Sequence, residues 1–272
     1  LTSTYGVGEM ILDAIGRGCR KIFMGIGGSA TNDVGMGMLR ALGFRFLDKN
    51  GNELLGRGKD LESVDKIDSQ YVDPKIKNVE FVVACDVDNP LVGESGASFV
   101  FAPQKGADHD TVLRLDSGMR NFAGVVKNEL GKDVAEMPGA GAAGGLGAAF
   151  AAFLGARLQS GIDMVLDAVG FDEKIKGADL ILTGEGSIDR QSLMGKVLSG
   201  VLKRAKNQNI PVVAVSGQVK DSEELNRAGF AAVFPIESGS VSLETAMSKS
   251  YASANLVRTI RQILLLIKAI PK

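Results

Sequence analysis

One glycine-rich segment of this sequence has the residue types and spacing of an anion-binding turn. Residues Lys21–Asp33 begin with a short apolar run and continue into glycines, hydroxyls and a carboxylate. Because glycine lacks a Cβ, the backbone at Gly27 and Gly28 can adopt positive φ, and successive N–H groups can converge on an anion. The helix expected over 33–42 would direct its positive N-terminal end to the same place. We therefore expect a phosphate or carboxylate site here, with polar side chains from Ser29, Thr31 and Asn32.

A second glycine-rich segment, Asp179–Lys196, repeats this pattern. Its first five residues predict a strand, residues 184–189 predict a turn, and the residues that follow predict a helix. Three members of the turn could bind phosphates: Gly184, Gly186 and Ser187. Two such turns with carboxylates nearby favour phosphoryl chemistry.

Phosphoryl transfer needs anchored phosphates, a metal held by carboxylates, and an acceptor hydroxyl close to a base. Glu185 could bind Mg²⁺, and Asp189 could act as the base or as a second ligand of the metal. Lys105 and Lys196 could neutralise phosphate charge. Asp189 has a structural alternative, which is to cap the following helix together with Ser192.

Asp86 is a further candidate for the catalytic site. It follows an apolar strand predicted over 80–84, and it shares its loop with Asp88 and Asn89. These side chains could serve the reaction, or they could form an Asx-turn that only shapes the loop. The sequence leaves both alternatives open.

The predicted elements that must position these residues place the chain in the α/β class. From Asp179 onward strands alternate with helices, which predicts a doubly wound parallel sheet of the flavodoxin or Rossmann type. Earlier in the chain, Asn50-Gly51 suits a type I′ hairpin turn, so this part should contain a mixed sheet. A short strand is expected over 99–102, and an amphipathic helix over 110–130.

The most glycine-dense stretch, Met137–Gly147, marks the expected change between two domains, residues 1–136 and 137–272. It contains a G-x-G-x-x-G pattern from Gly139 to Gly144. Little apolar strand precedes this pattern, so it indicates dinucleotide binding only weakly. Close helix packing or a mobile hinge is one alternative for the stretch, and contact with a ligand is another.

Composition argues against several functional classes. Lys and Arg total 31 against 32 for Asp and Glu, and no basic tract with interleaved aromatics occurs, so nucleic acid is not an expected partner. No apolar run approaches the roughly 18 residues of a membrane span. The two cysteines lie outside any metal-type spacing and His109 is the only histidine, which argues against zinc and favours the reduced cytoplasm.

Six motifs run through the chain in one order: Thr2-Ser3…Gly6…Gly8-Glu9, Gly25-Ile-Gly-Gly-Ser-Ala-Thr-Asn-Asp33, Ala84-Cys-Asp-Val…Asn89-Pro-Leu, Pro103-Gln-Lys-Gly-Ala107, Pro138-Gly-Ala-Gly-Ala-Ala-Gly-Gly145 and Thr183-Gly-Glu-Gly-Ser-Ile-Asp189. Together they resemble the bacterial glycerate kinase family of the first type. The resemblance implies phosphorylation of D-glycerate with ATP and Mg²⁺ in the cytoplasm, on two α/β domains that flank a cleft. Of the two possible products, 2-phosphoglycerate is favoured, and a homodimer is a possible assembly.

Two features of this sequence differ from the usual pattern of the family. Val34 stands where the family usually has a further glycine. The opening strand of the family and its Asp-Ser-Phe/Tyr-Lys-Glu-Ser-Leu type segment do not occur in the sequence, so we expect an amino-terminally truncated chain that lacks a strand and a catalytic lysine.

Two other functions stay open. An NAD(P)-dependent oxidoreductase is one, because Gly25–Ala30 fits G-x-G-x-x-A and Asp48 lies where a ribose-binding acid would belong. Against it, Asp33 lies near the helix start that should receive the pyrophosphate, and Asp48 opens a hairpin. The other is a non-catalytic protein that binds a nucleotide or a carboxylate.

Overall fold

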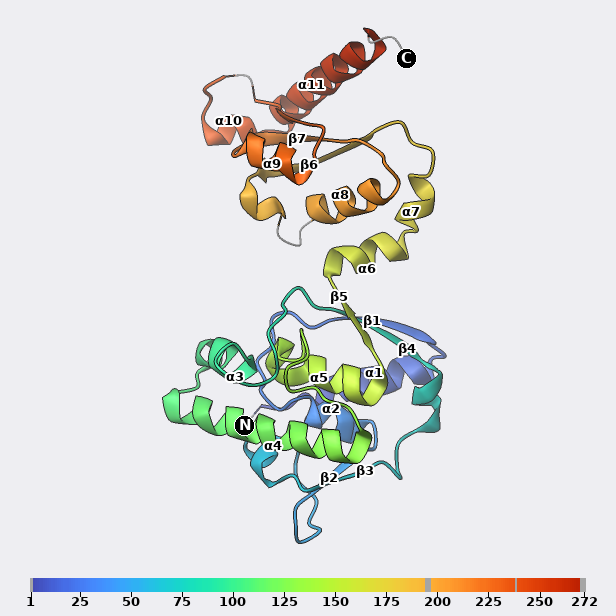
Figure 1. Ribbon diagram of the computed structural model, residues 1–272, viewed down its shortest axis with the longest axis vertical. Coiled ribbons are helices and arrows are strands. Elements are labelled where there is room, and N and C mark those ends of the chain that lie inside the picture. Colours follow the sequence, from blue (N-terminus) through green and yellow to red (C-terminus); the bar gives the residue numbers. More distant parts are fainter. Residues whose placement is uncertain (1, 194–196, 238, 270–272) are drawn as a thin grey trace. The chain divides into compact units, whose positions relative to one another are not determined.

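The computed structural model describes residues 2–193, 197–237 and 239–269, and the chain divides into two compact units, Leu1–Gly161 and Ile162–Lys272 (Figure 1). Both units contain a parallel β-sheet with helices, as expected for the α/β class. Among the described residues, no helix combines the length and the hydropathy needed to cross a membrane.

The first unit contains one parallel sheet, one antiparallel pair of strands, and helices. In chain order its elements are α1 (Tyr5–Gly16), β1 (Lys21–Gly25), α2 (Met36–Ala41), β2 (Arg45–Leu47), η1 (Gly58–Ser63), β3 (Lys66–Asp68), η2 (Pro74–Asn78), β4 (Glu80–Ala84), α3 (Ala97–Phe101), η3 (Pro103–Lys105), α4 (His109–Leu130), α5 (Ala142–Leu154) and β5 (Arg157–Gln159).

The mixed sheet expected for this part of the chain is wrong, because the parallel and the antiparallel strands belong to two separate sheets. The parallel sheet has the order β1-β4-β5, and β2 pairs antiparallel with β3. The predicted hairpin at Asn50-Gly51 is present as a tight turn, because Asp48 Oδ1 accepts the N–H groups of Asn50 and Asn52, both at 2.8 Å. Leu47 and Glu53 then form an antiparallel bridge.

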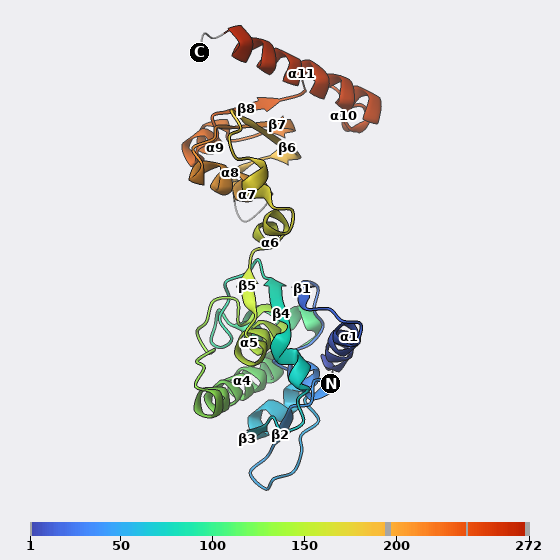
Figure 2. The ribbon, with the colours of Figure 1, turned by 90° about the vertical axis from the view of Figure 1, so that its right-hand side faces the viewer.

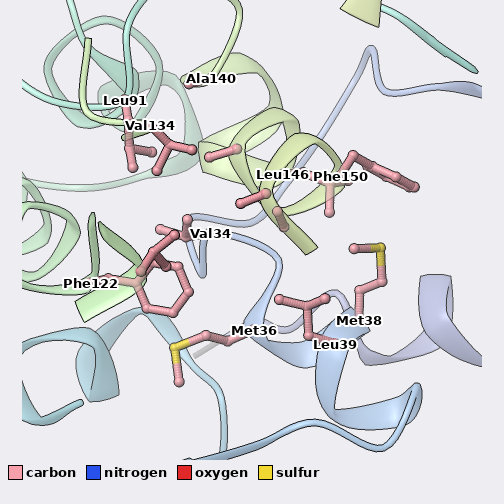
Figure 3. Close-up of a cluster of buried hydrophobic side chains, with 14 of the residues drawn as sticks. Val34, Met36, Met38, Leu39, Leu91, Phe122, Val134, Ala140, Leu146 and Phe150 are labelled. Atoms are coloured by element: carbon pink, nitrogen blue, oxygen red, sulfur yellow. The ribbon is translucent and has the colours of Figure 1, made fainter. Parts of the chain in front are cut away.

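The core of the first unit surrounds the short helix α2. Val34, Met36 and Leu39 are fully buried, and Figure 3 shows them close to side chains from α4 and α5, including Phe122 and Phe150. These residues belong to one continuous apolar cluster. The polar loop before α2 is therefore anchored directly on the core of its unit.

Helix α4 follows the predicted amphipathic pattern closely. Asp108 caps its N-terminus by accepting the N–H of Thr111 at 2.9 Å, and Gly131 ends it with φ +67°. The apolar face, which includes Met119 and Phe122, is buried, while the opposite face is exposed. Local capping and apolar spacing both specify this helix.

The strand expected over 99–102 is wrong, because these residues belong to helix α3 and the residue after it. Ala97 and Ser98 are fully buried on the side that packs against α4 and α5. A run of four apolar residues has no periodicity long enough to distinguish a strand from a helix.

The boundary between the units lies after Gly161, whereas the sequence placed the domain change near Met137. Helix α5 packs into the first core through Ala149 and Phe150, and β5 pairs in parallel with β4. These two contacts hold residues 137–161 in the first unit.

The second unit contains a three-stranded parallel sheet and helices. Its elements are α6 (Gly161–Ala168, which begins at the boundary), α7 (Phe171–Lys174), β6 (Ile181–Ile188), η4 (Arg190–Leu193), α8 (Val197–Asn207), β7 (Val212–Val219), α9 (Ser222–Ala228), β8 (Ala232–Pro235), α10 (Leu243–Met247) and α11 (Lys249–Ala269).

The sheet of the second unit has the order β6-β7-β8 and packs against helices on both faces. One core contains Leu198 and Leu202 of α8 and Leu225 of α9, and a smaller one joins Val213 of β7 to Ile263 of α11. Figure 2 shows α11 on the opposite side of these strands from α8 and α9. This arrangement agrees with the predicted parallel βα units.

Candidate functional site

Lys105 joins two of the segments that the sequence selected. It ends the 3₁₀ helix η3, and its Nζ donates hydrogen bonds to Ser29 Oγ at 2.9 Å and to the carbonyl oxygen of Thr31 at 2.8 Å. Burial lowers the pKa of Lys105 to about 8, and the negative charge of Asp33 acts in the opposite direction. The lysine therefore titrates much closer to neutral pH than an exposed lysine does.

A hollow of about 450 Å³ lies beside this lysine, and we call it the glycine-loop hollow. The residues that line it include Gly27, Gly28, Ser29, Asp86, Gln104 and Lys105. Gly28 has φ +69°, and no atom lies within 4 Å of the position that a Cβ would take at Gly27 or Gly28. The structure thus brings together five predicted site residues, and it leaves the glycine backbone open to a ligand.

Asp86 is exposed at this hollow and has a defined backbone partner. Its Oδ1 accepts the N–H of Gly161 at 2.8 Å. Nearby, the Nδ2 of Asn89 donates to the carbonyl oxygen of Ser95 at 2.7 Å. These two bonds connect the loop to later segments of the unit, and they hold the Asp86 carboxylate beside the hollow.

Asp33 has a structural role that the sequence did not reveal. Its fully buried carboxylate accepts bonds from Thr4 N (2.7 Å), Thr4 Oγ1 (2.8 Å), Gly35 N (3.1 Å) and Gly37 N (3.4 Å). Burial raises the pKa of Asp33, and these hydrogen bonds oppose the rise. Because Asp33 accepts the N–H groups of Gly35 and Gly37 and Thr4 Oγ1 accepts that of Met38, these N–H groups at the start of α2 already have partners, and the expectation that this helix end faces a ligand is wrong.

Thr31 and Asn32 line a different hollow of about 320 Å³, which also includes Lys105. Sequence reasoning missed three charged residues that line it, Lys59, Glu62 and Arg114. Lys59 and Glu62 belong to η1 and Arg114 to α4, so they meet only in the folded unit. No local motif in the sequence could have indicated this grouping.

The glycine-dense stretch before α5 serves close packing in this unit. A Cβ on Gly144 would lie 2.0 Å from the carbonyl oxygen of Thr31, and one on Gly147 would lie 2.2 Å from that of Gly139. Val34 N donates to the carbonyl oxygen of Gly144 at 3.1 Å. These contacts support the packing alternative for the stretch, because only glycine allows two backbones to approach so closely.

In the second unit, the turn expected over 184–189 is wrong. Gly184, Glu185, Gly186 and Ser187 belong to strand β6, which pairs with β7 as far as Ile188. A Cβ on Gly184 would lie 2.3 Å from the carbonyl oxygen of Val215, so this glycine permits close strand pairing. Gly186 has no atom within 4 Å of its own Cβ position and stays accessible.

Ser192 connects the two predicted metal ligands of this unit. This buried hydroxyl donates to Glu185 Oε2 at 3.3 Å and accepts the N–H of Asp189 at 3.4 Å. Within the described ranges, no group of three or more His, Cys, Asp or Glu side chains could hold a metal ion. The remaining catalytic candidate, Lys196, lies outside the described residues.

Comparison with known proteins identifies the family. The model of the glycerate kinase family matches residues 1–268. The chain belongs to the glycerate kinase family. The glycerate kinase of Halalkalibacterium halodurans is 48% identical over 249 residues, which are 91% of this chain and 66% of that protein.

Two further relatives support the assignment of this chain to the glycerate kinase family. The glycerate 2-kinase of Escherichia coli is 44% identical over 96% of this chain and 70% of its own length. A solved structure from Salmonella typhimurium LT2, of a protein assigned as glycerate kinase 2, matches with a TM-score of 0.80 at 42% identity over 98% of this chain and 70% of that one. The chain thus spans about two thirds of the length of these relatives.

Val34, the residue at which this glycerate kinase family member differs from the usual motif, has a backbone conformation typical of glycine. Its φ is +49°, in the left-handed region that favours glycine. The side chain is nevertheless fully buried in the first core. Valine accepts a strained backbone here and fills apolar space that glycine would leave empty.

Proposed function

We propose that this chain phosphorylates the 2-hydroxyl group of D-glycerate with ATP and Mg²⁺ in the cytoplasm, with 2-phosphoglycerate as the product. Membership of the glycerate kinase family supports the reaction class. The observation that carries the proposal is the glycine-loop hollow, where Gly27, Gly28, Lys105 and Asp86 surround one small space. This combination suits a small hydroxy acid, because it offers donors and a cation to a carboxylate and a base to a hydroxyl.

Lys105 is the proposed binding group for the acceptor carboxylate. An ammonium has three N–H donors, and two of them bind Ser29 and Thr31, so one remains. The open backbone at Gly27 and Gly28 adds donors on the same side of the hollow. These groups would hold glycerate by its carboxylate and leave its hydroxyls free to react.

Asp86 is the proposed base. Its carboxylate is exposed at the hollow and has one oxygen bound to Gly161, which orients the group. In the proposed step, the acceptor hydroxyl loses its proton to Asp86 as its oxygen attacks the terminal phosphoryl group. At the same time the bond between the terminal phosphorus and the bridging oxygen breaks, and its electron pair stays on that oxygen, which leaves as part of the nucleoside diphosphate.

The second unit supplies candidates for the nucleotide and the metal. Mg²⁺ is usually held by one or two carboxylates together with substrate phosphates, and Glu185 and Asp189, joined through Ser192, fit this donor set. When bound, Mg²⁺ would neutralise developing phosphate charge. Gly186 offers an accessible backbone, and Gly184, Ser187 and Lys196 remain predictions for phosphate contact.

A coupled assay for ADP release with D-glycerate and MgATP tests the proposal, with NMR of the product to distinguish 2- from 3-phosphoglycerate. Calorimetric titration with glycerate gives a second readout that does not need turnover. Asp86→Asn should retain glycerate binding and lose turnover, whereas Lys105→Gln should weaken binding. Glycerate binding without any phosphorylation would instead favour the non-catalytic alternative.

The oxidoreductase alternative has little support from the geometry. Asp33 binds the N-terminal N–H groups of α2, where a pyrophosphate would have to lie. Asp48 binds the N–H groups of its own hairpin turn. Neither residue is placed as dinucleotide binding requires, and the absence of glycerate-dependent NADH formation would agree with this.

A further inference from the structure

The smaller hollow of the first unit has an excess of positive charge. We call it the cationic hollow, and its walls come from the loop at Thr31 and Asn32, from η1, from η3 and from the start of α4. Lys59, Lys105 and Arg114 line it together with one carboxylate, that of Glu62. Three positive charges and one negative charge leave an excess of two, which matches the charge of a phosphate dianion.

Two cations of this hollow, Lys59 and Arg114, have no acidic partner among the residues that the structure describes, whereas the buried Asp33 acts electrostatically on Lys105. No carboxylate oxygen of that part of the chain lies within 4.0 Å of Lys59 or Arg114, and Lys105 donates only to the uncharged oxygens of Ser29 and Thr31. Arg204 of the second unit differs in this respect, because it contacts three carboxylates, those of Asp163, Asp167 and Asp172.

The hollow also has capacity for hydroxyl groups. The hydroxyls of Thr31 and Thr111 line the same space.

We propose that the cationic hollow binds a small phosphate ester that also carries a hydroxyl or a carboxylate, at a site separate from the glycine-loop hollow. Its volume of about 320 Å³ suits a small metabolite. Charge complementarity selects the phosphate, and the hydroxyls of Thr31 and Thr111 can bind the hydroxyl or carboxylate of the same molecule. Lys105 lines both hollows, so an anion here would contact the residue that also binds the acceptor.

The test is a calorimetric titration of the full chain without ATP, so that its outcome does not depend on catalysis. The probes are 2-phosphoglycerate, inorganic phosphate and unphosphorylated glycerate. Arg114→Gln and Lys59→Gln should each weaken binding of 2-phosphoglycerate roughly tenfold, as expected for a lost bond to a charged group. Arg114→Lys and Lys59→Arg, which keep the charge, should retain most of the affinity.

Matched controls separate this site from its surroundings. Lys132→Gln removes an exposed lysine that does not line the hollow and should leave binding unchanged. Thermal unfolding of every variant shows whether its fold is intact.

Three outcomes would overturn the proposal. Unchanged affinity in both Arg114→Gln and Lys59→Gln would show that the ester binds elsewhere. Loss of binding in Gly28→Val but not in Arg114→Gln would place the ester in the glycine-loop hollow. Inorganic phosphate that binds as tightly as the ester would show that phosphate alone is recognised, and the assignment to an ester would be wrong.

Discussion

Glycerate affinity should depend on pH through Lys105. Burial lowers the pKa of this residue to about 8, so the ammonium proposed to hold the acceptor carboxylate loses its proton as the pH rises through that value. A group with a pKa near 8 is about one tenth protonated at pH 9 and about one hundredth at pH 10. The affinity for glycerate should therefore fall roughly tenfold for each pH unit above about 8.

Calorimetric titration with glycerate between about pH 6.5 and pH 10 measures this dependence. Lys105→Arg should bind with nearly constant affinity over the range, because a guanidinium stays charged throughout. Lys105→Gln should bind weakly and show no inflection, and the control Lys132→Gln should follow the wild type. An inflection near the same pH in Lys105→Gln would refute the assignment to Lys105.

The same pKa predicts the direction in which stability changes with pH. In the folded chain Lys105 has a pKa of about 8, below its unfolded value of about 10.4. Between these values the unfolded state binds more protons, so the free energy of unfolding should rise with pH in this window. The full shift corresponds to about 3 kcal/mol, and solvent screening of this half-buried group reduces the expected gain to about 1–2 kcal/mol. Urea unfolding of wild type and Lys105→Gln at both ends of the window measures it, and equal pH dependence in the two proteins would contradict the reasoning.

Three further substitutions test other parts of the structure. Gly28→Val should raise the KM for glycerate while the fold survives, because φ +69° disfavours valine by about 1–2 kcal/mol and the side chain would enter the hollow; unchanged kinetics would leave Gly28 as a plain turn residue. Asp189→Asn should lower kcat by about 10²–10⁴ with less effect on ATP affinity, and a loss of roughly 1 kcal/mol in stability alone would indicate a capping role. Thr4→Val removes a hydroxyl that donates to Asp33 and accepts from Met38 N, so urea unfolding should show a loss of about 1–3 kcal/mol; no loss would show that the buried carboxylate finds other donors.

Several elements were predictable because short-range chemistry specifies them. Strand β4 lies where the apolar run over 80–84 placed it, and α4 begins one residue before its predicted range. The hairpin turn at Asn50-Gly51 follows from the conformational freedom of glycine and the local bonds of Asp48. In each case the information lies within a few residues of the element itself.

The candidate site was predictable in part for the same reason. Gly27, Gly28 and Lys105 were selected from glycine spacing and charge, and the glycine-loop hollow contains all three. The sequence could not show that Lys59 and Arg114 line the same hollow as Lys105, because they come from different elements of the unit. Their proximity depends on how α4 packs against η1, and no local pattern encodes it.

Other outcomes were decided only by tertiary structure. Residues 184–188 have the glycine content of a turn, yet they form a strand because β7 offers an equally long partner and glycine lets the two backbones approach. Asp33 begins the helix that was expected to point at an anion, yet the chain segment at Thr4 folds against its carboxylate and donates hydrogen bonds to it. Backbone N–H groups and carboxylates bind whichever partner the fold brings near them, and that partner can come from a distant part of the sequence.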